Sequence, residues 1–169
     1  MDYTLPYFGN LDLNALNEDY YSAIQTPKNN IAIELSFENK SIEQKIADGI
    51  RIFLENIEKL DEKNKITIAK DFEEEGSETS NYINFYLTEF DEAELLDIIG
   101  KKTEKTKMAD QLLDKLELTR IALYPDGRYG LTYYAMFDYT IYLNGFPCDQ
   151  LLVLFTDQQG SLEDIGWDS

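Results

Sequence analysis

The fold is decided by residues 117–156, which read ELTRIALYPDGRYGLTYYAMFDYTIYLNGFPCDQLLVLFT. Three apolar, aromatic-rich runs occur in this stretch, and clusters of turn-forming residues separate them. Short apolar runs bounded by Gly, Pro, Asn and Asp are typical of strands joined by turns. The stretch therefore predicts a β-meander around which the rest of the chain is arranged.

The longest run, Leu131 to Leu143, alternates along its length, so its side chains divide between the two faces of a strand. One face holds Leu131, Tyr133, Ala135, Phe137, Tyr139, Ile141 and Leu143, and the other holds Thr132, Tyr134, Met136, Asp138, Thr140 and Tyr142. A register slip of one residue would expose the first set. We therefore expect the odd-numbered face to pack on the core.

Further strands are expected on both sides of this run. Leu118 to Tyr124 leads into Pro125-Asp126-Gly127, where proline presets φ and glycine accepts a positive φ, so these residues predict a hairpin. After the Asn144-Gly145 turn, Leu151 to Phe155 is apolar on both faces. A last short strand is expected near Leu162 to Trp167.

The first 40 residues also predict strands. Leu11 and Leu13 alternate with polar neighbours, and two strands, Tyr20 to Gln25 and Ile31 to Phe37, flank a polar loop. These strands either extend the C-terminal sheet or form a small separate sheet, since their periodicity allows both arrangements.

Residues 41–116 predict four to five helices. Ser41 and Gln44 have capping-box spacing, and the apolar residues from Ile42 to Leu60 form a narrow stripe at helical period. Asp61 fits the cap of a second helix that runs to about Glu75. Later helices are indicated by the apolar residues of Tyr82 to Phe90, Leu95 to Ile99 and Met108 to Leu116.

Together these elements predict a single α+β domain over residues 1–169. An antiparallel sheet, made of the C-terminal meander (117–169) and the N-terminal strands (1–40), is covered by the helices of residues 41–116. A length of 169 residues fits one domain with one core, and a hydrophobic content of 43% argues against disorder.

Composition limits the compartment and the partners. The single Cys148 cannot form an internal disulfide, and Met1-Asp2-Tyr3 is unlike the start of a signal peptide, so a cytoplasmic location is expected. With 33 acidic and 15 basic residues, the formal charge is -18. Phosphate backbones and anionic lipids repel such a charge. We therefore expect no direct nucleic-acid or membrane partner, and attraction to a basic protein.

The chain contains no histidine, which removes Ser-His and Cys-His nucleophilic pairs and the commonest transition-metal ligand. One cysteine cannot build a structural zinc site, and neither G-x-G-x-x-G nor G-x-S-x-G occurs. We therefore predict that the protein is not an enzyme and has no catalytic residue, cofactor or metal site. A metal-dependent enzyme that works through carboxylates alone is an alternative.

Two groups of residues are candidates for partner binding. Tyr134, Met136, Asp138 and Tyr142 combine aromatic area with polar atoms, as recognition surfaces do, and the equal alternative is that a helix covers them. Covering would perturb the pKa of Asp138. Otherwise, Asp138 is expected near solvent or bonded to a tyrosine or backbone N–H. The second group consists of acidic helix ends, which meet a basic partner or form a solvated face: Glu73, Glu74, Glu75, Asp91, Glu92 and Glu94.

Four short motifs carry a resemblance to a known family. They are Pro6-Tyr7-Phe8-Gly9, Phe37-Glu38-Asn39-Lys40, Tyr124-Pro125-Asp126 and Phe137-Asp138-Tyr139-Thr140. With these motifs the chain resembles a bacterial family defined only as a domain of unknown function, which carries over no catalytic residue. Small acidic proteins of this kind are common among the immunity proteins of bacterial toxin systems, so the resemblance implies an inhibitor by analogy.

These observations predict an acidic bacterial binding protein. An immunity protein that occludes a basic, nuclease-like toxin is the first hypothesis. The carboxylate-based enzyme and a nucleic-acid mimic that blocks a DNA-binding protein are the alternatives.

Overall fold

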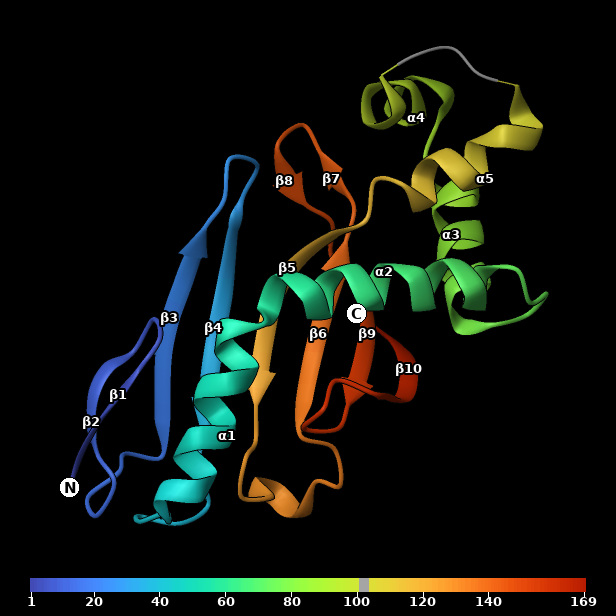
Figure 1. The fold of residues 1–169 in the computed structure, drawn as a ribbon. Helices are drawn as coiled ribbons and strands as arrows, with labels where there is room; N and C mark the ends of the chain where they lie inside the picture. The colour runs from blue at the N-terminus through green and yellow to red at the C-terminus, as the bar shows by residue number, and fades with distance from the viewer. Residues whose placement is uncertain (101–103) are drawn as a thin grey trace.

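A six-stranded sheet forms the centre of the computed structural model, which describes residues 1–100 and 104–169 (Figure 1). Its strand order is β10-β9-β6-β5-β4-β3. The strands are β3 (Asp19–Gln25), β4 (Asn30–Ser36), β5 (Glu117–Leu123), β6 (Ala135–Thr140), β9 (Leu151–Thr156) and β10 (Leu162–Asp168). The α+β class and the C-terminal meander are confirmed, and β3 and β4 extend the meander instead of forming a separate sheet.

The helices lie in the connection between β4 and β5. These two strands are parallel, whereas the other neighbours are antiparallel, and parallel neighbours need a long crossover. The crossover contains α1 (Gln44–Glu55), α2 (Ile57–Phe72), α3 (Glu78–Glu89), α4 (Glu92–Ile99) and α5 (Lys105–Leu113). Figure 1 shows α1 and α2 across one face of the sheet, with α3, α4 and α5 toward the β9–β10 end.

Two hairpins lie outside the main sheet. β1 (Asp2–Leu5) pairs with β2 (Gly9–Asp12) beside β3, where the Ser22 hydroxyl donates to the Tyr7 carbonyl at 2.7 Å. β7 (Tyr142–Leu143) pairs with β8 (Phe146–Pro147) and extends past the end of the sheet (Figure 1). A 3-10 turn, η1 (Arg128–Gly130), lies between β5 and β6.

The core lies between the sheet and the helices. Strand register places Ile33, Ile121, Phe137 and Leu154 side by side across four strands, and all four are buried. The Phe53 ring of α1 packs on Phe137 with the ring centroids 5.9 Å apart. Burying an apolar side chain of this size contributes roughly 1.5–3 kcal/mol, so this row holds the helix layer on the sheet.

The expected strand from Leu131 to Leu143 is wrong in length. β6 covers only Ala135–Thr140, and residues 131–134 belong to a longer connection from β5. The Asp126 carboxylate in this connection accepts hydrogen bonds from the backbone N–H groups of Glu38 and Asn39, each at 2.9 Å. The predicted hairpin of β5 and β6 is confirmed, and its connection is a longer loop that is bound to the segment before α1.

The expected capping box at Ser41 and Gln44 is also wrong. α1 begins at Gln44 with Glu43 as its N-cap, and no side chain caps it. A capping box is found at α4 instead, where the Asp91 carboxylate accepts from the Glu94 N–H and the Glu94 carboxylate accepts from the Asp91 N–H, both at 2.9 Å. Ser41 and Gln44 therefore have the sequence spacing of a capping box but do not form its hydrogen bonds.

The first helix ends earlier than its apolar stripe predicts. α1 stops at Glu55 because Asn56 has φ -111° and ψ 14°, and the Asn56 side chain donates to the Ile52 carbonyl at 2.7 Å. Asp61 therefore lies inside α2 and does not cap it. The stripe continues to Leu60 across the break, so helical period alone does not reveal the corner.

The turn after β9 packs directly on α2, which gives a test of the fold. Gly160 has φ +70°, and a Cβ at this position would overlap Leu60 Cδ2. We expect Gly160→Ala to lower the free energy of unfolding by about 2–4 kcal/mol, because the positive φ and the overpacking each add a cost. Gly145→Ala is the control, since Gly145 has φ +81° with no atom within 4 Å of its would-be Cβ. Equal losses for the two variants in urea unfolding would contradict the packing of Gly160 on Leu60.

Candidate functional site

One face of the six-stranded sheet has no helix over it in the part of the chain that the structure describes. α1 and α2 lie on the opposite face (Figure 1). Strand register aligns the side chains of the uncovered face in rows, one of which joins Glu34, Ala122, Met136 and Phe155. We name this surface the open face, and its large or charged side chains are Asp19, Tyr21, Glu34, Arg120, Tyr124, Arg128, Tyr129, Tyr133, Met136, Asp138 and Phe155.

Arg120 lies at the centre of the open face between two carboxylates. Its Nε donates to Asp138 Oδ2 at 2.7 Å, and its Nη1 donates to Glu34 Oε2 at 3.4 Å. The Asp138 side chain is only 2% exposed, whereas that of Arg120 is 41% exposed. Asp138 Oδ1 is buried and accepts no hydrogen bond from the described residues. In this ion pair, Asp138 is therefore the buried partner, and its Oδ1 atom has no hydrogen-bond donor among the described residues.

Burial and Arg120 act on the pKa of Asp138 in opposite directions. Burial raises this pKa, the hydrogen bond and charge of Arg120 lower it, and burial has the larger effect, so the pKa lies above its ordinary value. We expected a perturbed pKa only if a helix covered this face. Instead, the neighbouring long side chains bury the carboxylate. The expectation that Asp138 would lie near solvent or bond to a tyrosine or backbone N–H is wrong, because its partner is an arginine.

A row of aromatic rings crosses the open face. The Tyr129 ring contacts Tyr124 at a centroid distance of 6.3 Å, Tyr124 contacts Tyr133 at 5.9 Å, and Tyr133 contacts Phe155 at 4.7 Å. Tyr21 lies directly opposite Glu34 in the β3–β4 pair. Tyr21 and Tyr129 are 72% and 67% exposed, so this surface presents aromatic area to solvent.

The backbone fixes the position of Tyr129. Its φ of 62° lies in the left-handed region that bulky residues rarely adopt. Arg128 holds this conformation, because its Nη1 donates to the Glu18 carbonyl at 2.7 Å and also pairs with the Asp19 carboxylate. The Arg128 guanidinium lies 4.7 Å from the centroid of the Tyr129 ring. The exposed ring is therefore stacked on an anchored cation.

Of the four candidates on the predicted even face, Met136 and Asp138 lie on the open face, and the placement of Tyr134 beside them is wrong. The Tyr134 ring packs against Phe53 of α1 at a centroid distance of 5.2 Å, on the helix side of the sheet. Its hydroxyl is buried without a described partner, and burial raises its pKa. The chain bends at residue 134, so Tyr134 and the buried Ala135 both face the core and the alternation is interrupted. The expected inward placement of Tyr133 is wrong for the same reason, because its ring packs against Phe155 on the open face.

The other sequence candidates lie elsewhere. Tyr142 belongs to the separate β7–β8 hairpin, and its hydroxyl accepts from Asn29 Nδ2 at 3.2 Å. Three exposed carboxylates follow the end of α2, and three others begin α4: Glu73, Glu74, Glu75, Asp91, Glu92 and Glu94. Asp91 and Glu94 form the capping box, which gives them a structural role at the helix start. The acidic candidates thus belong to the helices, apart from the open face.

Sequence reasoning missed Glu34, Arg120, Tyr21 and Tyr129. The signal for one pair was present, because Arg120 and Asp138 are single charged residues in apolar runs that we expected to be neighbouring strands. Opposite charges in facing strand positions attract each other. No local sequence pattern indicated the positive φ of Tyr129 or the position of Tyr21 opposite Glu34.

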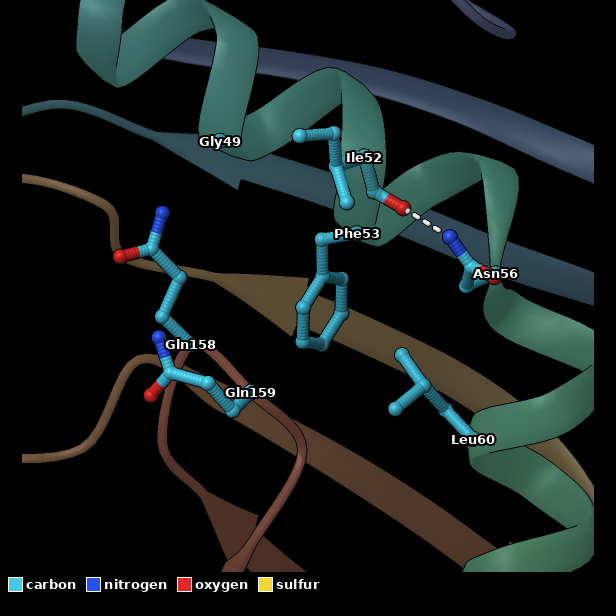
Figure 2. Close-up of a pocket in the computed structure, with 7 residues that line it drawn as sticks. All are labelled: Gly49, Ile52, Phe53, Asn56, Leu60, Gln158 and Gln159. Carbon is cyan, nitrogen blue, oxygen red and sulfur yellow. Dashed lines mark hydrogen bonds between the residues drawn. The ribbon is translucent and has the colours of Figure 1, made fainter.

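Pockets on the helix side differ in charge. Figure 2 shows a pocket of about 390 Å³ between α1 and the β9–β10 turn, in which the Phe53 ring and the Gln158 and Gln159 amides approach one another. Its lining carries no formal charge: Gly49, Ile52, Phe53, Asn56, Leu60, Gln158 and Gln159. A second pocket, of about 400 Å³ at the α1–α2 corner, has an apolar floor and includes Glu55, Glu58 and Asp61. Within the described residues, no group of three or more Cys, Asp or Glu is arranged to hold a metal ion.

Comparison with known proteins finds no matching family model, curated protein or solved structure. Across residues 1–100 and 104–169, no helix is both long and apolar enough to cross a membrane. The chemistry of the open face and the charge of the exterior are therefore the basis for assigning a function.

We expect Arg120→Met to destabilise the protein, because it leaves the buried Asp138 carboxylate without its charged partner. Breaking a fully buried pair costs about 3–5 kcal/mol. Since Arg120 is partly exposed, we expect a loss of about 1–3 kcal/mol in the free energy of urea unfolding. The double variant Arg120→Met/Asp138→Leu should recover part of this loss, because no charge remains buried.

The control for the Arg120 and Asp138 variants is Arg51→Met. Arg51 pairs with Asp48 at 3.6 Å on the surface of α1, where both side chains are more than two-fifths exposed. Exposed pairs of this kind contribute about 0–1 kcal/mol. An Arg120→Met loss no larger than that of Arg51→Met, or a further loss in the double variant, would contradict the coupling of Arg120 to Asp138.

The raised pKa of Asp138 predicts a pH dependence with a definite sign. The folded protein binds this proton more tightly than the unfolded chain, so the stabilisation is fully present below the ordinary pKa of 3.8 and is lost as the pH rises through the folded pKa. Acidification from about pH 7 to pH 4 should therefore stabilise the wild type relative to Asp138→Asn, which cannot take up the proton. Urea unfolding of both proteins across this range measures the difference, and a constant or opposite trend would refute it.

Proposed function

We propose that this protein is an acidic binding protein that occludes a basic protein partner, as immunity and inhibitor proteins do. The observation that carries the proposal is the excess of carboxylates, since 33 acidic residues face only 15 basic residues. Pairing within the chain cannot neutralise such an excess. Compensation by a cationic partner lowers the electrostatic free energy of the complex and speeds its formation.

The distribution of ion pairs supports this proposal. None of the described ion pairs includes Glu73, Glu74, Glu75, Asp91 or Glu92, and these side chains are exposed. By contrast, the two arginines of the open face are already bound to carboxylates of the same chain. The helix layer therefore offers negative charge to a partner, and the open face offers no unpaired arginine to an anionic one.

Binding accounts for the chemistry of the open face better than catalysis does. Its charged groups are paired with each other, Arg120 with Asp138 and Glu34, and Arg128 with Asp19. Tyrosine supplies large contact area at low cost in conformational entropy and is enriched among residues that dominate binding energies. We include a cytoplasmic location and an immunity role against a basic toxin in this proposal.

Co-expression with the products of neighbouring genes tests the proposal. We expect capture of a basic protein whose association rate falls at least about tenfold between 50 mM and 500 mM NaCl, because salt screens attraction between surface charges. Failure to capture a partner, or a partner whose association does not depend on salt, would refute the proposal.

A charge variant extends this test. Glu73→Gln/Glu74→Gln/Glu75→Gln should lower the association rate several-fold and leave the dissociation rate nearly unchanged, since peripheral charges act mainly on encounter. Thr88→Ser, on the exposed surface of α3, is the neutral control. An unchanged association rate would show that these carboxylates do not steer the partner.

A further inference from the structure

We propose that the open face is the docking surface for the basic partner, and that it binds a surface bearing arginine side chains. This inference rests on the proposed function and names the site through which the protein would act. The acidic helix ends then attract the partner at a distance, and the open face holds it.

The first argument is that the open face is an unpartnered sheet surface with exposed aromatic anchors. Tyr21 and Tyr129 expose about seven-tenths of their surface, and the rings of Tyr124 and Tyr133 continue the aromatic surface inward from Tyr129. Tyrosines in such positions are typical of the few residues that carry most of a binding energy. The left-handed backbone and the Arg128 contacts fix Tyr129 before binding, which reduces the entropy lost on association.

The second argument is charge complementarity. Among the described residues, the cations of this face, Arg120 and Arg128, both donate to carboxylates of the chain itself. The face therefore offers no unpaired cation to an anionic ligand, and its carboxylates Asp19, Glu34 and Asp138 outnumber its two arginines. A partner that brings hydrogen-bond donors with positive charge satisfies this arrangement.

The third argument favours arginine among cations. The open face already binds two arginines of its own chain. Arg128 stacks on the Tyr129 ring beside Asp19, and Arg120 bridges Asp138 and Glu34. Guanidinium groups combine stacking on an aromatic ring with hydrogen bonds to a carboxylate. Tyr21 and Glu34 lie directly opposite each other on β3 and β4 and offer the same pair of groups to a partner.

A second copy of the chain does not fit the open face. Each copy carries a formal charge of -18, so two copies repel each other at all but high salt. The two arginines on this face are engaged within their own chain. The occupant is therefore a different, cationic protein.

The principal experiment measures binding of the captured partner to Tyr21→Ser/Tyr129→Asn. Asparagine tolerates the positive φ at position 129, so the loop is kept while both rings are removed. We expect the Kd to rise at least about 30-fold, mostly through faster dissociation. Ile66→Ser is the matched control, because Ile66 is 73% exposed on α2, and it should change the Kd less than about 3-fold. Circular dichroism and urea unfolding verify that both variants are folded.

A second experiment tests the arginine chemistry without the natural partner. Hexa-arginine amide, titrated into isotopically labelled protein, should shift backbone NMR signals of β3, β4, β5 and β6 around Tyr21, Glu34 and Arg120. These shifts should be lost in Tyr21→Ser/Tyr129→Asn and retained in Ile66→Ser. Shifts confined to the acidic ends of α2 and α4 would overturn the assignment of the open face.

The outcomes separate this inference from the proposed function. A salt-sensitive partner that binds Tyr21→Ser/Tyr129→Asn as tightly as the wild type refutes the docking surface and leaves the binding function intact. Absence of any basic partner refutes the function and the inference together. Sedimentation of the protein alone should show a monomer, and a dimer that the double variant dissociates would assign the open face to self-association and overturn the proposal.

Discussion

Burial of one face of a single sheet is the constraint on which the rest of the structure depends. The parallel pairing of β4 with β5 forces a long crossover between them, and this crossover carries the helices to one side. The row of Ile33, Ile121, Phe137 and Leu154, with Phe53 above it, fixes the register of the sheet and the position of α1 together. Slipping the register would remove both.

The uncovered face follows from this one-sided layer, and it has its own packing. Ala122 and Val153 are buried although no described helix lies over them, because longer neighbours in the same rows cover them. Buried polar groups on this face must therefore find hydrogen-bond partners among the side chains of neighbouring strands. Arg120 therefore bridges Glu34 and Asp138, and burial by neighbours, not by a helix layer, raises the pKa of Asp138.

The proposed function assigns different roles to the two sides of the molecule. Carboxylates on the helices act over a Debye length and need no defined geometry to attract a cationic partner. Rings and acceptors on the open face act at contact distance, where their fixed positions matter. In this proposal, the anionic exterior speeds association with the partner, and the preorganised surface slows dissociation. Neither role requires a reacting group.

Sequence alone determined the α+β class, the C-terminal meander, the inward side of Phe137 and Tyr139, and the net charge, because alternation, turn residues and composition are local properties. It also placed Met136 and Asp138 on the opposite face. Tertiary structure alone decided that no described helix covers this face, that Tyr134 turns inward and that Arg120 bonds Asp138. Those features depend on strand register and on the side taken by a crossover, which join residues far apart in the chain and leave no mark in local periodicity.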